Sequence, residues 1–169
     1  MALVAVLMSA SCAKEDPAKP IDYSAPEKQA TIKGKLLIND NTTLTTPKYS
    51  AISGVTIIAS ISYSSLSGDD AQGSFSTTAT TDSKGDFTLT VPATSSGVTV
   101  NLVANDIQGS LTTTSTSGSG SGTEIQQGKW SFDLSSPSVL SGQTVILSSV
   151  VGTFTQIKSA GDEVGNDYY

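Results

Sequence analysis

Two segments of the chain alternate apolar and polar residues with a period of two. From Thr31 to Ile38, the even positions form an apolar face with one glycine, while Lys33 and Lys35 face the other way. From Val55 to Tyr63, the odd positions are apolar or aromatic and the even positions carry mostly hydroxyl groups. This period is typical of strands that bury one face in a core.

Further strands are predicted along the rest of the chain, and no segment shows a sustained 3.6-residue period. They cover Ser74–Thr81, Asp86–Val91, Val98–Ala104, a weak Gly109–Thr114, Lys129–Leu134 and Gln143–Thr155. The last is long and apolar, which predicts a strand that is buried on both faces or paired at the centre of the sandwich. Phe87, Trp130, Phe132 and Leu134 are expected to point inward. Seven or eight short strands separated by turns predict an all-β fold, an antiparallel β-sandwich.

Turn-forming residues separate the predicted strands. The run Asp82-Ser83-Lys84-Gly85 predicts a tight turn, because Asp bonds to nearby main-chain amides and Gly accepts a positive φ. The Gly/Ser run 118–122 predicts a loop tip or linker. With 169 residues, of which 50 are Ser or Thr and 37% are hydrophobic, the chain suits one packed sheet domain, expected over 30–157.

The charged residues exclude several functions. The chain has nine lysines, no arginine and no histidine, with a net charge of −6. An acidic surface without Arg does not favour nucleic acid as a partner. Without His, imidazole-based triads and His/Cys zinc sites are excluded. The carboxylates Glu124, Asp133 and Asp106 form no obvious pair for glycoside hydrolysis. We therefore expect no enzyme activity and no cofactor.

The N-terminus predicts export. Residues 2–8 form an apolar run too short to span a bilayer, followed by Ser9-Ala10-Ser11 and Cys12. This arrangement resembles the lipobox of bacterial lipoproteins, which implies that residues 1–11 are a signal segment and that Cys12 is acylated after cleavage. The absence of Lys or Arg before the run is consistent with a start upstream of Met1. Residues 12–29 then predict a solvated tether, and 158–169 an acidic tail.

The residues after the cysteine predict where the protein is located. Lys14-Glu15-Asp16 resembles the lipoprotein export signal of Bacteroidetes, a Lys followed by two acidic residues. The resemblance implies an outer-membrane lipoprotein facing the cell surface, with the membrane as partner through the lipid on Cys12. The alternative interpretation of these residues is a solvated charge cluster in the tether.

A second resemblance covers residues 30–104. The segments 32–35, 52–57 and 80–89 resemble the carboxypeptidase regulatory-like domain, a prealbumin-like sandwich of Bacteroidetes surface proteins, whose hairpin reads Thr-Asp-x-x-Gly-x-Phe. Asp82, Gly85 and Phe87 carry the most specific part of the match. The resemblance implies a non-catalytic folding, spacing or docking module.

Few residues are candidate binding groups. Tyr49 is the candidate glycan contact, since flat rings stack on sugars, while Trp130 is predicted to pack in the core and Tyr63 is a further candidate. Oxygen-rich clusters at 39–41, 69–70 and at Asp82 with Asp86 offer calcium ligands in principle, but their spacing favours turns. An isopeptide link from Lys33 or Lys35 to Asn101 is a further hypothesis.

Three functions remain open from the sequence. They are a surface-anchored structural or interaction module, a carbohydrate-binding accessory lipoprotein of a glycan-uptake system, and a fimbrial or adhesin component. The identity of the protein or glycan partner does not follow from the sequence.

Overall fold

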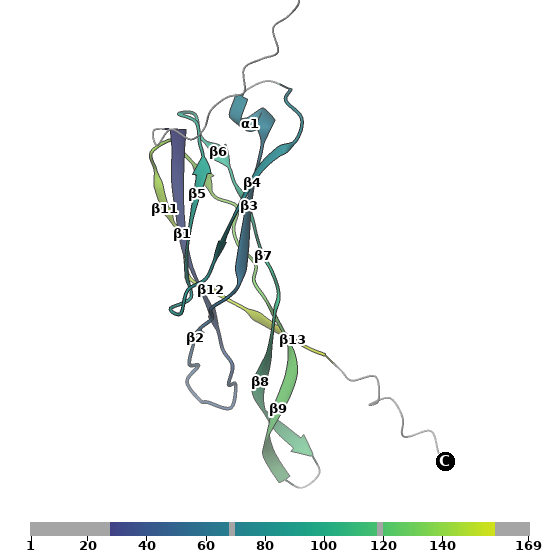
Figure 1. Ribbon diagram of the computed structural model, residues 1–169. Helices are drawn as coiled ribbons and strands as arrows, with labels where there is room; N and C mark the ends of the chain where they lie inside the picture. Colours follow the sequence, from purple (N-terminus) through teal and green to yellow (C-terminus); the bar gives the residue numbers. More distant parts are fainter. Residues whose placement is uncertain (1–27, 68–69, 118–119, 158–169) are drawn as a thin grey trace, which may run out of the picture.

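The computed structural model describes residues 28–67, 70–117 and 120–157. Within them the chain forms thirteen strands and one short helix, α1 (Tyr63–Ser67) (Figure 1). The strands are β1 (Gln29–Ile38), β2 (Ser50–Ala51), β3 (Thr56–Ser62), β4 (Ser74–Thr80), β5 (Asp86–Pro92), β6 (Val98–Thr99), β7 (Asn101–Ala104), β8 (Ile107–Ser117), β9 (Gly120–Ser131), β10 (Ser138–Val139), β11 (Thr144–Ile146), β12 (Val150–Val151) and β13 (Thr153–Gln156). The all-β sandwich is therefore confirmed.

β1 lies at the centre of the first sheet. β5 pairs antiparallel with residues Gln29–Lys35 of β1, and β2 pairs with its last two residues. On the other side of β1, β11 and then β12 pair with it in parallel. A parallel neighbour needs a long crossover connection. Here all the strands from β2 to β10 lie between β1 and β11 in the chain.

The second sheet has the order β4-β3-β7, and β6, just before β7, pairs with β10. The third sheet has the order β13-β9-β8, in which β8 and β9 form a long hairpin. In Figure 1 this hairpin extends beyond the first two sheets, at the end of the molecule opposite to α1. Residues 105–157 therefore contribute strands to the sandwich and also form the projecting hairpin β8–β9.

One hydrophobic core joins the sheets. The alternation predicted for β1 and β3 is confirmed, because Ile32, Leu36, Ile57 and Ile61 are buried on the inward face. The aromatic and aliphatic positions predicted to point inward are buried as well, among them Phe87, Leu89, Val91, Val98, Val100, Leu102, Trp130, Phe132 and Leu134. Each such side chain contributes about 1.5–3 kcal/mol by its burial, so these alternating positions account for the sandwich.

The predicted turn at 82–85 joins the two main sheets between β4 and β5. Asp82 Oδ1 accepts hydrogen bonds from the amides of Lys84 and Asp86 at 2.8 and 3.0 Å, and the Gly85 amide donates to the Asp82 carbonyl. Gly85 has φ of +75°, as expected for its place in the turn. The chain then enters β5 in the register that buries Phe87.

Aromatic rings cover glycines of neighbouring strands. Phe87 is the cross-strand partner of Gly34, and a Cβ at position 34 would lie 2.5 Å from its ring. In the third sheet the ring of Trp130 covers Gly109 in the same way, and that of Phe154 covers Gly128. Trp130 and Phe154 also contact each other, with ring centroids 5.1 Å apart. The missing side chains leave the space that the rings fill.

Several predicted elements were wrong in extent. The segment 143–155 is not one doubly buried strand but β11, β12 and β13, and Ile146 is 77% exposed. It follows the edge of β1 and then crosses to β9, so its apolar residues alternate between core and solvent. The weak strand predicted at 109–114 is part of the eleven-residue β8.

Two further differences are local. Residues 120–122, predicted as loop, pair with β8 as the start of β9, while 118–119 lie outside the described residues. Tyr63 does not continue the inward face of β3 but begins α1 and is 39% exposed, because the chain turns there towards the 70–73 segment. Among the described residues, no helix has the length and apolar character needed to cross a bilayer.

Candidate functional site

The aromatic candidates for glycan binding separate into buried and exposed groups. Trp130 is 3% exposed and packs on Phe154, so it belongs to the core as predicted. Tyr49 is 52% exposed, in the loop that joins β1 to β2. Tyr63 is at the other end of the sandwich, on α1 (Figure 1). The two exposed tyrosines therefore do not form a common platform for a sugar.

The loop that carries Tyr49 is attached to the hairpin. The Asp40 carbonyl accepts from the Thr112 amide at 2.8 Å, and the Thr112 carbonyl accepts from the Thr42 amide at 2.9 Å. Asn41 Oδ1 accepts from the amide and the hydroxyl of Thr43. The 39–41 cluster therefore forms a turn against β8, as the sequence favoured, and brings Tyr49 to the hairpin end of the molecule.

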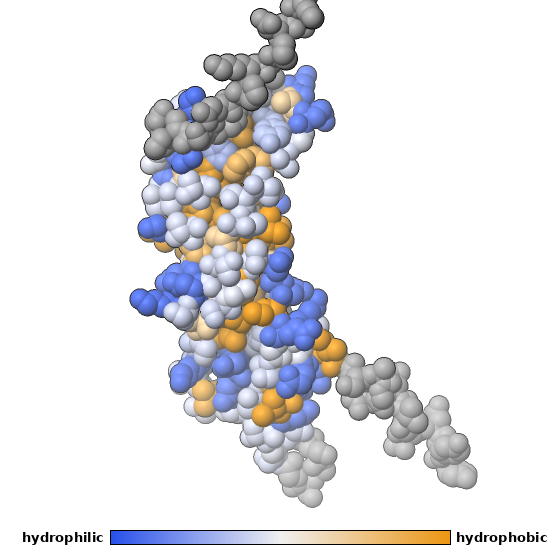
Figure 2. Space-filling view, viewed as in Figure 1, coloured by the Kyte–Doolittle hydropathy of each residue, from blue (hydrophilic) through white to orange (hydrophobic). Residues whose placement is uncertain are grey.

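The hairpin end is polar and nearly uncharged. On the outward face of β8 and β9, Gln108 pairs with Lys129, Ser110 with Gln127, Thr112 with Ile125 and Thr114 with Thr123. At the base of the hairpin Lys129 forms an ion pair with Asp106, at 2.6 Å. Figure 2 shows apolar residues at this end as separate spots among polar ones on the visible face. A hydroxyl- and amide-rich surface of this kind suits contacts by hydrogen bonds rather than by apolar burial.

In the described part of the chain, the carboxylates do not form a cluster of metal ligands. Within the described residues, no group of three or more His, Cys, Asp or Glu side chains is placed to hold a metal ion. Of the predicted clusters, Asp82 and Asp86 belong to the turn, and Asp69 lies outside the described residues. Hydrogen bonds from the main-chain amides of Asp86 and then Lys84 lower the pKa of Asp82 below its ordinary value.

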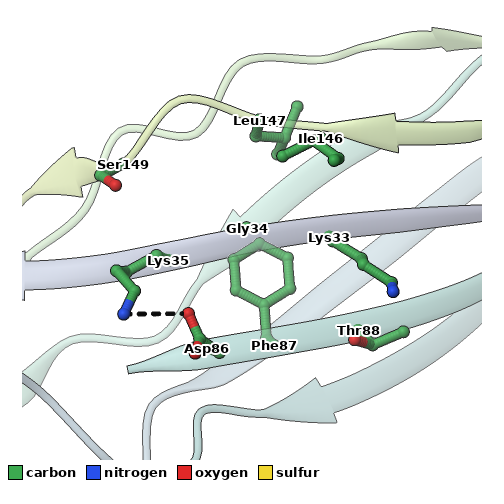
Figure 3. Close-up of a pocket in the computed structure, with 9 residues that line it drawn as sticks. All are labelled: Lys33, Gly34, Lys35, Asp86, Phe87, Thr88, Ile146, Leu147 and Ser149. Atoms are coloured by element: carbon green, nitrogen blue, oxygen red, sulfur yellow. Dashed lines mark ion pairs between the residues drawn. The ribbon is translucent and has the colours of Figure 1, made fainter. Parts of the chain in front are cut away.

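A shallow hollow of about 460 Å³ lies on the first sheet between β1, β5 and the β11–β12 segment (Figure 3). It arises from a bulge: Lys33 pairs with Ile146 and Leu36 with Val150, so two residues of β1 face three of the neighbouring segment. The hollow contains one carboxylate, Asp86, which forms an ion pair with Lys35 at 3.2 Å. Its lining has no second carboxylate and so does not contain the carboxylate pair that glycoside hydrolysis uses.

The isopeptide hypothesis does not fit the arrangement of the sheets. Lys33 and Lys35 lie on β1 in the first sheet, whereas Asn101 pairs with Ser60 of β3 in the second sheet. The Lys35 ammonium is held by Asp86 and by the Lys84 carbonyl. Neither lysine is therefore placed beside the Asn101 amide.

The residues that predict export lie outside the described part of the chain. These are Cys12 and the export signal Lys14, Glu15 and Asp16. What the structure does place is the start of β1 at Gln29, at the same end of the sandwich as α1 and β6 (Figure 1). The hairpin β8–β9 and the Tyr49 loop lie at the opposite end. This projection was hard to predict from the sequence, because Thr, Ser and Gly dominate it.

Comparison with known proteins adds little to this description. No protein-family model matches the chain, and no curated protein matches its sequence. Among solved structures, the chain is similar to a crystal structure of a candidate carbohydrate-binding protein from Pseudomonas aeruginosa. The two share 16% identity over 73% of this chain and 90% of the other, with a TM-score of 0.34. At this TM-score the similarity supports no conclusion about function.

Proposed function

We propose that this chain is an outer-membrane-anchored lipoprotein that displays a non-catalytic β-sandwich at the cell surface as an interaction module. The proposal joins the acylation signal at Cys12 and the export signal at 14–16 to one structural observation. β1 begins at one end of the sandwich, and the hairpin β8–β9 projects from the other (Figure 1). A chain anchored through its N-terminus thus presents the hairpin and the Tyr49 loop away from the membrane.

The packing of the 80–89 hairpin supports the resemblance to the carboxypeptidase regulatory-like domain. Asp82 organises the turn, Gly85 adopts a positive φ, and Phe87 lies over Gly34 of β1. Each matched residue of the motif therefore has a structural task. This favours a structural or docking role for the motif, and the proposal includes the resemblance to this domain.

Surface display can be tested with a protease site. A cleavage sequence inserted between Gly118 and Ser119 in the hairpin is expected to be cut by a protease added to intact cells. The same sequence inserted between Ala18 and Lys19, in the predicted tether, serves as a membrane-proximal control in the same chain. Resistance of the hairpin site in intact cells, with cleavage after lysis, would place the domain inside the cell envelope and contradict the proposal.

Glycan binding is a second candidate, favoured by the exposed ring of Tyr49 in the loop whose residues 40–42 bond to the hydroxyl- and amide-rich hairpin. A glycan array with the chain and its Tyr49→Ala variant tests it. Binding that is lost in Tyr49→Ala and kept in Tyr63→Ala supports a glycan site at the hairpin end. An array without any bound glycan rejects this candidate and leaves the display proposal unchanged.

A further inference from the structure

β4 forms an edge of the second sheet. It pairs with β3 over its full length and with no other described strand. Hydrogen bonds from Thr81 N to Val55 O and from Tyr63 N to Gly73 O mark the two ends of this pairing. Because antiparallel pairs alternate, the main-chain groups of Phe75, Thr77 and Ala79 face β3. Those of the alternate positions face away from the sheet: Ser74, Ser76, Thr78 and Thr80.

These outward groups are not satisfied within the described chain. None of the described residues donates to, or accepts from, the outward N–H and C=O groups of Ser74, Ser76, Thr78 and Thr80. The strand has the sequence SFSTTAT, without charge and without proline. Sheet edges usually carry a charged residue, a proline or a covering loop that prevents pairing with another chain. Within the part of the chain that the structure describes, β4 has none of these.

The other two edge strands of seven or more residues in the described chain, β5 and β8, do carry such protection. The outward positions of β5 include Pro92, which has no N–H, and Asp86, which is ion-paired to Lys35. The free edge of β8 is covered in its middle, because Thr112 bonds with Asp40 and Thr42. Among these long edge strands of the described chain, β4 is therefore the one that remains available.

We propose that β4 binds β4 of a second copy of this chain, antiparallel, so that the sheet β4-β3-β7 continues across the dimer. The choice of a second copy rests on the symmetry of the strand. The outward residues are placed evenly about Thr77, so a two-fold axis there pairs Ser74 with Thr80 and Ser76 with Thr78. The strand would form about eight main-chain hydrogen bonds in this register.

The side chains fit the same register. Phe75 of one copy stands opposite Ala79 of the other, a large residue against a small one. Hydroxyl groups of Ser and Thr face each other on the opposite face of the sheet, and no like charges are opposed within the strand. A heterologous strand would have to match this pattern, whereas a second copy matches it by construction.

The pairing also fixes the direction of the two copies. β4 leads through the 82–85 turn into β5, and β5 ends beside Gln29, so the Ser74 and Gln29 ends of the sandwich coincide. In an antiparallel dimer, the two Gln29 ends therefore lie at opposite ends. With the N-terminal anchor of the proposed function, on which this consequence rests, the two tethers leave the dimer at opposite ends, an arrangement that suits a bridge between two surfaces.

Association is tested on the expected mature chain, residues 12–169 with Cys12→Ser, by sedimentation over a concentration range, so that neither the lipid nor the apolar run 2–8 contributes to it. The chain is expected to show a monomer–dimer equilibrium. Ser76→Lys with Thr78→Lys places like charges opposite each other and is expected to weaken association more than about tenfold. Thr88→Lys with Thr90→Lys adds the same charge to the β5 edge and is expected to leave association unchanged.

The melting temperature of each variant confirms that the fold is kept, since all four side chains are exposed. A chain that stays monomeric at every concentration overturns the proposal. The proposal is also overturned if the β4 variant associates as strongly as the unsubstituted chain, or if the β5 variant weakens association as much as the β4 variant does.

Orientation is tested by single cysteines in the Cys12→Ser chain. Thr77→Cys is expected to form a disulfide with the same residue of the second copy. The two residues at position 77 lie opposite each other on the two-fold axis, at a separation that a disulfide can bridge. Ser74→Cys is expected to cross-link with Thr80→Cys when the two are mixed, and not with itself. Absence of the Thr77→Cys cross-link, or equal self-cross-linking of Ser74→Cys, overturns the antiparallel pairing.

Discussion

Gly85 offers the sharpest test of how the β4–β5 turn determines the sandwich. Its φ is +75°, a conformation that costs an alanine about 1–2 kcal/mol. A Cβ at this position would also overlap the Leu36 carbonyl oxygen of β1, and this neighbour is main chain that cannot rotate away. Gly85→Ala must therefore displace the turn from β1.

The displacement adds to the cost. The Gly85 carbonyl accepts from the Leu36 amide at 2.9 Å, and losing this bond costs about 1 kcal/mol. With the backbone conformation included, we expect Gly85→Ala to lower the free energy of unfolding by about 3 kcal/mol. Gly142 is a matched control, because its φ is also +75° and a Cβ there would have no atom within 4 Å. We expect Gly142→Ala to cost only the conformational part, about 1–2 kcal/mol.

Urea unfolding of both variants, in the Cys12→Ser chain, measures the difference between the two costs. Equal unfolding free energies for Gly85→Ala and Gly142→Ala would refute the reasoning, because the close approach of the turn to β1 would then have no energetic effect.

Three further predictions follow from the core, the turn and the tryptophan. Phe87→Ala removes a buried ring that lies over Gly34 and is expected to cost about 3–5 kcal/mol in urea unfolding, whereas Thr88→Ala, on the exposed face of the same strand, should change stability by less than about 0.5 kcal/mol. The folded pKa of Asp82 lies below its ordinary value of 3.8, so its carboxylate stabilises the fold above that pH, and this contribution is lost as the pH falls towards the folded pKa. Asp82→Asn should therefore flatten the decline of the urea midpoint below about pH 4, and an unchanged decline would show that the turn does not depend on this charge. Trp130, the one tryptophan of the chain, is expected to be shielded from iodide quenching until the protein unfolds, and quenching in the folded state would contradict its burial.

The strands that alternate cleanly were predictable from the sequence. In β1, β3 and β5, apolar residues occupy every second position because a single sheet face meets the core, and no other element competes for that face. The 82–85 turn was predictable for a similar reason, since Asp82 and Gly85 act through their immediate neighbours. These elements depend on interactions between residues that are close in the sequence, so short segments of the sequence are enough to predict them.

The remaining elements depend on distant partners. The segment 143–155 is apolar enough for one strand, but it pairs first with β1 and then with β9, and this exchange divides it into three. The hairpin β8–β9 is made of Thr, Ser and Gly, whose pattern does not separate loop from strand; its extent follows from an eleven-residue register and from the Trp130 and Phe154 rings over Gly109 and Gly128. The free edge of β4 was equally hidden, because it is defined by the strands that do not pair with it.

Determining whether Cys12 is acylated tests the proposed function most directly. Cells that express the chain are labelled with an alkyne fatty acid, and the mass of the N-terminal peptide is determined after purification from the membrane fraction. We predict a mature chain that begins at a lipid-modified Cys12, and a Cys12→Ala variant that takes up no label and leaves the outer membrane. An unlabelled wild-type chain, or a Cys12→Ala variant that stays bound to the cell surface, would contradict the lipid anchor.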